Sequence, residues 1–262
     1  MRQIARSVLC VMMMSLCLPL RVHGQDAPQR DAQAIALLQK MTSAAGWPAD
    51  NSLQDVTVHA TITITPLKGA VHSDQVVIKA RSSDEKVHVD NLTTGASMYR
   101  LDEFAIYRNG KTVRPIPWLS MEHLYGAFIP FLMPVHRFAN SDRELLYKGQ
   151  QDVNGASAYV VSTRQTDTTT GTRADLRRRA SQMTLSISTA TLLPLQSEIE
   201  MTLSNYTARI PTTIQYTNYQ QVDGISVPFE INVQPKGQAS FQIVIQSLQW
   251  NTGLTEGDFI PQ

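Results

Sequence analysis

The stretch Val56-Thr-Val-His-Ala-Thr-Ile-Thr-Ile-Thr65 decides the fold class of this chain. Apolar and polar residues alternate strictly along it, so that every second side chain leaves the same side of an extended backbone. One face would carry Val56, Val58, Ala60, Ile62 and Ile64. The opposite face would carry His59 and the threonines. This pattern is typical of a strand in an antiparallel sheet that buries one face and exposes the other to water.

The same alternation returns further along the chain, for example in Met183–Ile187 and Ile199–Leu203. Three dipeptides, Asn109-Gly110, Asn154-Gly155 and Asp223-Gly224, favour tight hairpin turns because both residue types tolerate positive φ. The spacing of βαβ units is absent from the sequence. We therefore predict a mainly antiparallel β fold with a few helices, in which about eleven strands form a half-open, incomplete barrel that encloses or is capped by helices.

A helix is predicted before the first strand. It would begin at Asp31, and Gly46 with Pro48 would end it. Its apolar residues recur at helical spacing and are Ala34, Leu37, Leu38 and Met41.

Residues 1–24 have the layout of a secretory signal peptide. Arg2 and Arg6 precede the apolar run Ser7–Leu20, and Val22-His-Gly24 supplies the small residue that a signal peptidase accepts. The run is too short to span a bilayer. We expect a mature protein of one domain, residues 25–262, that is exported across the inner membrane to the periplasm.

Composition limits the classes of function. Both cysteines, Cys10 and Cys17, lie in the predicted signal peptide, so the mature chain would be stabilised by its core alone. Loss of Arg2, Arg6 and Arg21 changes the formal net charge from +1 to −2. A nearly neutral chain gives no overall attraction to nucleic acid or anionic lipid. We predict no nucleic-acid partner and at most transient contact with membranes.

Signatures of catalysis are missing from the sequence. It has no Gly-x-Ser-x-Gly elbow, no His-Glu-x-x-His motif, no phosphate-binding glycine loop and no thiol in the mature part. His88 and Asp90 would share a strand face, but no third metal ligand is near them. Glu198 and Glu200 share a face in the same manner. Solvated strand faces explain both pairs, and we predict no enzyme activity, no metal and no cofactor.

The segment Trp118–His136 is the most suggestive one for ligand binding. Its large apolar side chains fit a helical stripe that Pro130 and Pro134 interrupt. The stripe could be ordinary core that plugs the open side of the sheet, or a movable lid over a lipid-sized cavity. For the second alternative, the expected lining is Trp118, Met121, Leu124, Tyr125, Phe128, Phe131 and Leu132, with Ile62 and Ile64 from the first strand.

The C-terminal third carries the most specific pattern. It reads Tyr216-x-x-Tyr219-x-x-Val222-Asp-Gly-Ile225-x-Val227-Pro-Phe229-x-Ile231, followed by Phe241-x-Ile243-x-Ile245 and Leu248-Gln-Trp250-Asn-Thr-Gly253-Leu254. Over Thr212–Phe259 this order resembles the C-terminal half of the bacterial outer-membrane lipoprotein carrier superfamily, in particular its divergent lipoprotein-sorting type (LolA/LolB-like fold). The resemblance implies an incomplete antiparallel barrel of roughly eleven strands around helices that occlude an apolar cavity.

The resemblance also implies a function. Carriers of this superfamily shield lipoprotein acyl chains across the periplasm, and relatives bind or sense lipidic ligands. The carriers have a functionally important arginine on the first strand, whereas Val56–Leu67 has none and Arg81 lies on the next strand. We expect an exported binder or carrier of lipid acyl chains or another apolar ligand, with lipoprotein sorting as one such role. The alternative is a protein-interaction or envelope-stress sensor module with a self-filled cavity and an envelope protein as partner.

Overall fold

The computed structural model describes residues 28–48, 52–81, 84, 86–101, 104–116, 142–166, 171, 175, 178–179, 181–202 and 209–261. These ranges include the predicted first strand and all of the C-terminal motif, Thr212–Phe259. The predicted signal peptide 1–24 and the apolar segment Trp118–His136 lie outside the described residues.

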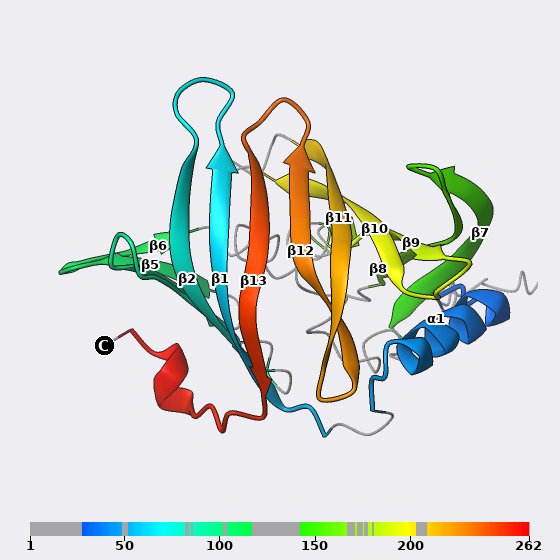
Figure 1. The fold of residues 1–262 in the computed structure, drawn as a ribbon, viewed down its shortest axis with the longest axis horizontal. Helices are drawn as coiled ribbons and strands as arrows, with labels where there is room; N and C mark the ends of the chain where they lie inside the picture. The colour runs from blue at the N-terminus through cyan, green and yellow to red at the C-terminus, as the bar shows by residue number, and fades with distance from the viewer. Residues whose placement is uncertain are drawn as a thin grey trace, which may run out of the picture.

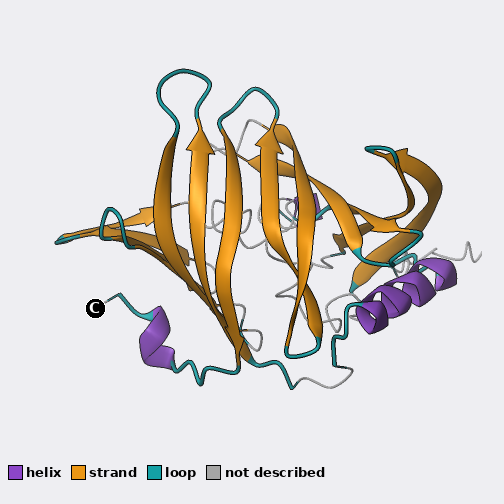
Figure 2. Cartoon of the chain, in the orientation of Figure 1, coloured by secondary structure: helices purple, strands orange, loops and turns teal. Residues whose placement is uncertain are grey.

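Thirteen strands of the described chain form one antiparallel sheet, ordered β6-β5-β4-β3-β2-β1-β13-β12-β11-β10-β9-β8-β7 (Figure 1, Figure 2). The strands are β1 (Asp55–Thr65), β2 (His72–Arg81), β3 (Lys86–Asn91), β4 (Ala96–Leu101), β5 (Phe104–Asn109), β6 (Thr112–Ile116), β7 (Arg143–Val153), β8 (Ala156–Gln165), β9 (Met183–Ser188), β10 (Pro194–Thr202), β11 (Arg209–Val222), β12 (Ile225–Pro235) and β13 (Ser240–Trp250). Among the described strands, β1 and β13 are the neighbouring pair that are far apart in the sequence, and they lie at the centre of the sheet.

The predicted fold class is confirmed: the sheet is mainly antiparallel and is not closed into a barrel. The sheet has thirteen strands, where about eleven were expected. The short strand β9 was recognised from its alternation, whereas β4, which has six residues, was not. A strand of six residues has only three side chains on each face, so its alternation is hard to recognise in the sequence.

Two of the three predicted hairpin turns are confirmed as placed. Asn154 and Gly155 have φ of 54° and 82°, and Asp223 and Gly224 have φ of 53° and 83°, as a tight primed turn requires. The third turn is shifted by one residue. Asn109 pairs with Thr112, so the turn consists of Gly110 and Lys111 rather than Asn109 and Gly110.

A β-bulge in β13 explains the change of phase in its apolar pattern. His59 pairs with Ser247 and Ala60 with Ile245, which leaves Gln246 as the extra residue. The bulge keeps Ile243, Ile245 and Leu248 on the same face although Leu248 is out of step with the other two.

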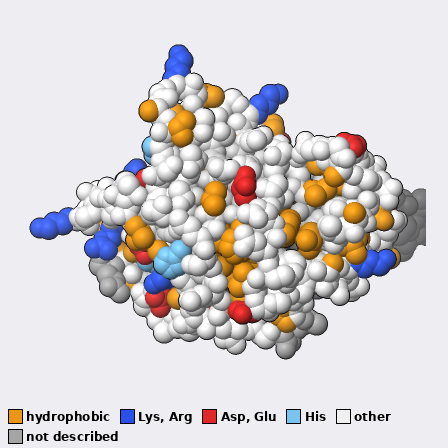
Figure 3. Space-filling view, in the orientation of Figure 1, with side chains coloured by type: hydrophobic (Ala, Val, Ile, Leu, Met, Phe, Trp, Pro, Cys, Tyr) orange, Lys and Arg blue, Asp and Glu red, His pale blue; other side chains and the backbone are white. Residues whose placement is uncertain are grey.

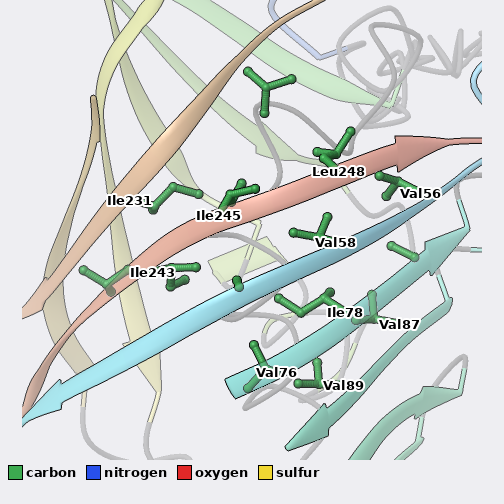
Figure 4. Packing of buried hydrophobic residues seen from close by; sticks show 14 of the residues in the cluster. Val56, Val58, Val76, Ile78, Val87, Val89, Ile231, Ile243, Ile245 and Leu248 are labelled. Atoms are coloured by element: carbon green, nitrogen blue, oxygen red, sulfur yellow. The ribbon is translucent and has the colours of Figure 1, made fainter. Parts of the chain in front are cut away.

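The sheet curls, so that its central strands β1, β13 and β12 stand forward in Figure 1 and its two ends turn away. We call the face that carries Val56, Val58 and Ile62 the inner face, and the opposite face the outer face. The larger hydrophobic cluster lies on the inner face (Figure 4). Its buried residues from β1, β2, β3 and β13 include Val56, Val58, Ile78, Val87, Val89, Ile243, Ile245 and Leu248.

The predicted helix is confirmed as α1 (Ala32–Ala44). The Asp31 side chain caps it by accepting a hydrogen bond of 2.9 Å from the Gln33 amide. The four predicted apolar residues of α1 are all buried, in a second cluster with Leu145, Val161, Leu185 and Ile187. Gly46, with φ of 75°, ends the helical segment next to Gly224 of the β11–β12 turn.

Candidate functional site

The inner face is mainly apolar along the run of neighbouring strands β2-β1-β13-β12-β11-β10-β9. Side chains directly opposite one another on neighbouring strands share a face, so the register extends that face across the sheet. Ile64 lies opposite Phe241, Phe241 opposite Val233, and Val233 opposite Ile214. Ile214 lies opposite Ser197, and Ser197 lies opposite Leu185, which belongs to the second cluster. The clusters under β1 and under α1 therefore form one continuous inner face, and α1 covers its β7–β9 end.

One end of the inner face is closed by tryptophans. The rings of Trp47, just after α1, and Trp250, at the end of β13, meet edge to face with centroids 5.7 Å apart. Both pack against the larger cluster beside Leu53. The Trp250 Nε1 is buried without a hydrogen-bond partner.

The other end of the inner face is less covered. Ile62 and Ile64 of β1 are half-buried, as is Phe241 of β13, whereas Val56 and Val58 at the opposite end of β1 are 3% and 1% exposed. Phe229 of β12 is also half-buried, but it lies nearer the middle of the face, since Val233 is the β12 residue opposite Phe241. Apolar side chains that remain partly accessible on a concave sheet are the surface that an apolar ligand would cover. We take this end of the inner face as the candidate site.

The structure places two of the nine predicted lining residues. Ile62 and Ile64 lie on the inner face as predicted, and Ile62 packs against the larger cluster. The other seven, Trp118, Met121, Leu124, Tyr125, Phe128, Phe131 and Leu132, lie outside the described residues. The lining as a whole thus remains a prediction.

Two buried arginines on the inner face were missed by the sequence analysis. Arg100 of β4 is opposite Val87 and Ala105, and it is 6% exposed. Arg143 of β7 is 9% exposed. Each is engaged in contacts within the chain. The burial of Arg100 could have been inferred from the sequence, because Arg100 lies two residues from Met98 and therefore shares its face of β4.

A buried hydroxyl pair joins β10 to β11 on the inner face. The hydroxyls of Ser197 and Tyr216 are 2.7 Å apart, and the exposed fractions of these residues are 0% and 2%. Burial raises the pKa of the Tyr216 phenol well above its ordinary value, although the Ser197 hydrogen bond acts in the opposite direction. The neutral Tyr216 phenol therefore connects the two strands by a hydrogen bond and does not act as an acid or a base.

The C-terminal 3-10 turn η1 (Glu256–Phe259) lies on the outer face against β3 and β4, and cations of β2 pair with it. Lys79 donates to the Asp258 carboxylate at 2.8 Å, and Arg81 donates to Glu256 at 2.7 Å. The Arg81 guanidinium also lies 5.0 Å from the ring centroid of Phe259, which is fully buried. Arg81, which follows the expected position of the carrier arginine, therefore anchors the tail on the outer face.

His88 and Asp90 share a strand face as predicted, but the expected solvated face is wrong for His88. The C-terminal turn buries His88 to 7% exposure. Its Nδ1 lies 2.7 Å from the Asp258 carbonyl oxygen and its Nε2 lies 2.9 Å from Asp90 Oδ1. The two contacts fix the orientation of the ring against the C-terminal turn. The ring also stacks on Tyr99 with centroids 4.1 Å apart.

The second acidic pair lies on the outer face of β10. Glu198 is exposed beside Gln196, and Glu200 is half-buried and pairs with Arg209 at 3.4 Å. In the described ranges, no group of three or more His, Cys, Asp or Glu side chains could hold a metal ion.

The C-terminal motif has a structural role in this chain. The buried carboxylate of Asp55, at the start of β1, accepts hydrogen bonds from the amides of Thr252, Gly253 and Leu254 at 2.6 to 3.2 Å. The Asn251 side chain binds the backbone of residues 52 and 54. Tyr219 donates to the Pro194 carbonyl at 2.6 Å. These residues close the sheet between β1 and β13 and tie β11 to β10, so the motif identifies a scaffold rather than a ligand.

Among the helices that the structure describes, none is long and apolar enough to cross a membrane.

Solved structures share the fold. An outer membrane lipoprotein-sorting protein domain from Vibrio parahaemolyticus is 15% identical, with a TM-score of 0.57, and the match covers 87% of this chain and 96% of that one. A DUF1329 family protein from Desulfovibrio piger is 14% identical, with a TM-score of 0.57 and coverage of 87% and 96%. A LolA superfamily protein from Nitrosomonas europaea is 12% identical, with a TM-score of 0.58 and coverage of 86% and 97%.

No protein-family model matches the chain, and no curated protein matches its sequence significantly. At identities of 12 to 15% the likeness to solved structures concerns the fold. The chain has the half-open antiparallel fold of the LolA and outer-membrane lipoprotein-sorting proteins, the superfamily that its C-terminal motif resembles.

Proposed function

We propose that this protein is an exported, periplasmic binder or carrier of lipid acyl chains or a similar apolar ligand. The ligand would lie on the inner face, over the less covered end of β1 and β13. The proposal includes cleavage of residues 1–24, a mature protein of one domain and no covalent chemistry. The names of the proteins that share the fold, lipoprotein-sorting and LolA superfamily proteins, agree with it.

One observation carries the proposal: the apolar inner face ends in half-buried Ile62, Ile64 and Phe241. An acyl chain laid over them would gain about 0.8 kcal/mol for each methylene removed from water. A palmitoyl chain could gain on the order of 10 kcal/mol in this way, without an ionic anchor. Binding of a flexible chain loses part of that gain to ordering, so micromolar affinity is a reasonable expectation.

A charge placed at the candidate site tests the proposal. Ile64→Asp puts a carboxylate on the inner face, where a bound acyl chain would have to desolvate it. We expect the variant to lose at least tenfold in affinity for a fluorescent fatty acid. Thr63→Asp is the matched control, since it adds the same charge to the next residue of β1 on the outer face. Equal affinity of the two variants would contradict the proposed site.

The apolar segment Trp118–His136 is tested separately. Phe128→Asp should abolish uptake of the same fatty acid while the protein remains exported and folded. Unchanged uptake would remove the segment from the site but would leave the contribution of Ile62 and Ile64 untouched. Loss of uptake in Phe128→Asp alone, with full uptake in Ile64→Asp, would place the ligand against the segment and not against β1.

The alternative, an interaction or envelope-stress sensor module, predicts a different result for the wild-type protein. Its inner face would be filled by its own side chains, and native mass spectrometry of protein purified from the periplasm would show no bound lipid. Co-purifying lipid that is absent from Ile64→Asp supports the proposed binder.

A further inference from the structure

The β5–β6 hairpin forms one edge of the sheet, and it differs from the opposite edge. At that other edge, the segment before α1 pairs with β7: the Asp31 amide donates to the Leu145 carbonyl at 2.8 Å, and the Leu145 amide donates to the Gln29 carbonyl at 2.9 Å. In the described chain, β6 pairs with β5 alone. Its first four residues are exposed and Ile116 is half-buried. Figure 1 shows β5 and β6 reaching away from the rest of the sheet.

This hairpin concentrates positive charge. Residues 104–116 contain Arg108, Lys111 and Arg114 and no acidic residue. Asp102 and Glu103 precede β5, at the end away from the turn, and lie outside the described residues. Figure 3 shows Lys and Arg side chains at the end of the molecule where Figure 1 has β5 and β6.

The cations of the hairpin differ from those of the neighbouring strands. On β2 and β3, Lys79, Arg81 and Lys86 are all paired with the acidic C-terminal turn. Arg108, Lys111 and Arg114 form no ion pair with any residue that the structure describes. The charge of the mature chain is close to zero overall, so the hairpin is a local excess of positive charge without an ion-pair partner among the described residues.

The arrangement of the three cations indicates the shape of their partner. Arg108 is opposite Val113 and Arg114 is opposite Tyr107, so the two arginines lie on different faces of the hairpin, and Lys111 lies in the turn. Cations on both faces and at the tip do not converge on one small anion. The three cations could instead all contact anionic groups if the end of the hairpin inserts into a layer of such groups.

Apolar groups accompany these cations. Val113 is 56% exposed, and the Arg114 guanidinium lies 4.8 Å from the ring centroid of half-buried Tyr107. Tyrosine and arginine side chains with an apolar body and a polar end are favoured at the level of lipid headgroups.

An acidic polypeptide that adds a strand to β6 fits the hairpin less well. Antiparallel strands use alternate residues for their mutual hydrogen bonds. Asn109 and Thr112 close the turn as a pair, so Val113 and Pro115 direct their main-chain groups outward. Pro115 has no N–H, which leaves Val113 as the one outward donor between Thr112 and Ile116.

We propose that the β5–β6 hairpin docks this protein transiently on an anionic phospholipid surface through Arg108, Lys111 and Arg114. The proposal goes beyond the proposed function and does not depend on it, because docking requires no ligand on the inner face. For a carrier, such docking would bring the protein to the surface from which an apolar ligand is collected.

The test is flotation of the mature protein with vesicles of phosphatidylethanolamine and phosphatidylglycerol, compared with vesicles of phosphatidylcholine. Wild type should bind only the anionic vesicles, and high salt should release it. The triple variant Arg108→Gln/Lys111→Gln/Arg114→Gln should bind them on the order of 100-fold more weakly, because each cation near an anionic surface contributes about one factor of five.

The matched control is Lys40→Gln/Lys68→Gln/Lys236→Gln. It removes the same charge from exposed positions on α1 and on the turns that follow β1 and β12, and it should retain most of the binding. Ile64→Asp should dock as wild type does, which separates docking from ligand binding. The proposal is overturned if wild type ignores anionic vesicles, if the control loses as much as the hairpin variant, or if the hairpin binds polyglutamate but no vesicles.

Discussion

Gly46 joins α1 to the sheet, and its conformation allows a very close approach. A Cβ at this position would overlap the Gly224 carbonyl oxygen, and φ is 75°. Gly46→Ala should therefore cost about 3 kcal/mol of unfolding free energy, from strain and from displacement of the β11–β12 turn. Gly95→Ala is the control, because φ there is 71° and no atom lies within 4 Å of the added carbon. Urea denaturation should show a loss of only about 1 kcal/mol for Gly95→Ala. Equal losses for both variants would contradict the contact.

The buried pair of Ser197 and Tyr216 gives a second prediction at the scale of residues. Tyr216→Phe removes one hydroxyl and leaves the Ser197 hydroxyl buried without its partner, which should cost about 2 kcal/mol. Adding Ser197→Ala removes the second hydroxyl and should recover part of that loss. Additive losses in a double-mutant cycle, measured by urea denaturation, would show that the two hydroxyls do not act together.

Individual side chains were predictable where local periodicity determines them. The alternation of β1 placed Ile62 and Ile64 on the inner face, and helical spacing placed Leu37 and Leu38 of α1 in the core. The role of Asp55 was not predictable, because its partners lie 197 to 199 residues away. The burial of His88 depends in the same way on the C-terminal turn. Contacts of this kind come from the register of the whole sheet, which no local pattern contains.

The C-terminal turn η1 is an element whose attachment should depend on pH. The hydrogen bond from Lys79 and the Thr255 amide lower the pKa of Asp258 to about 2. A depressed pKa in the folded state stabilises the protein above the ordinary aspartate pKa of about 3.9, and this contribution is lost as the pH falls from about 4 to about 2. The pKa values of Asp84 and Glu256 are lowered as well, by Arg81 and Lys86, so they act in the same direction.

Asp258→Asn should remove part of this pH dependence. At pH 7 we expect a loss on the order of 1 kcal/mol, because Asp258 is partly solvated, and a smaller decrease of Tm between pH 4 and pH 2 than in wild type. Glu198→Gln, which removes an exposed carboxylate on β10, is the control. Circular dichroism melts across this range check the prediction. A wild-type slope in Asp258→Asn would show that the turn does not depend on this carboxylate.

Elements were predicted best where they are long or end in a characteristic turn. α1, β1 and the hairpins at Asn154-Gly155 and Asp223-Gly224 were found from sequence, whereas β4, a strand of six residues, was not recognised. The hairpin of β5 and β6 was found with its turn displaced by one residue. Its cations have no ion-pair partner among the described residues because the hairpin lies at the edge of the sheet. This position could not be predicted from the sequence.

At the scale of the molecule, one apolar surface runs along the inside of an open sheet. The sequence predicted this architecture, because alternation gives each strand an apolar face and short turns keep the strands antiparallel. The C-terminal motif predicted the fold shared with the lipoprotein-sorting proteins. The same motif says little about the ligand, since Asn251, Gly253 and Tyr219 hold the scaffold together.

The most direct measurement of the central claim is NMR of isoleucine methyl groups in the mature protein, titrated with 13C-labelled palmitate. If the inner face binds an acyl chain, the methyl resonances of Ile62 and Ile64 should shift and show contacts with the methylenes of the chain. The methyl groups of Ile260, which is 49% exposed and follows η1, should not change. Shifts confined to Ile260, or no shift of Ile62 and Ile64 at saturating palmitate, would contradict the account.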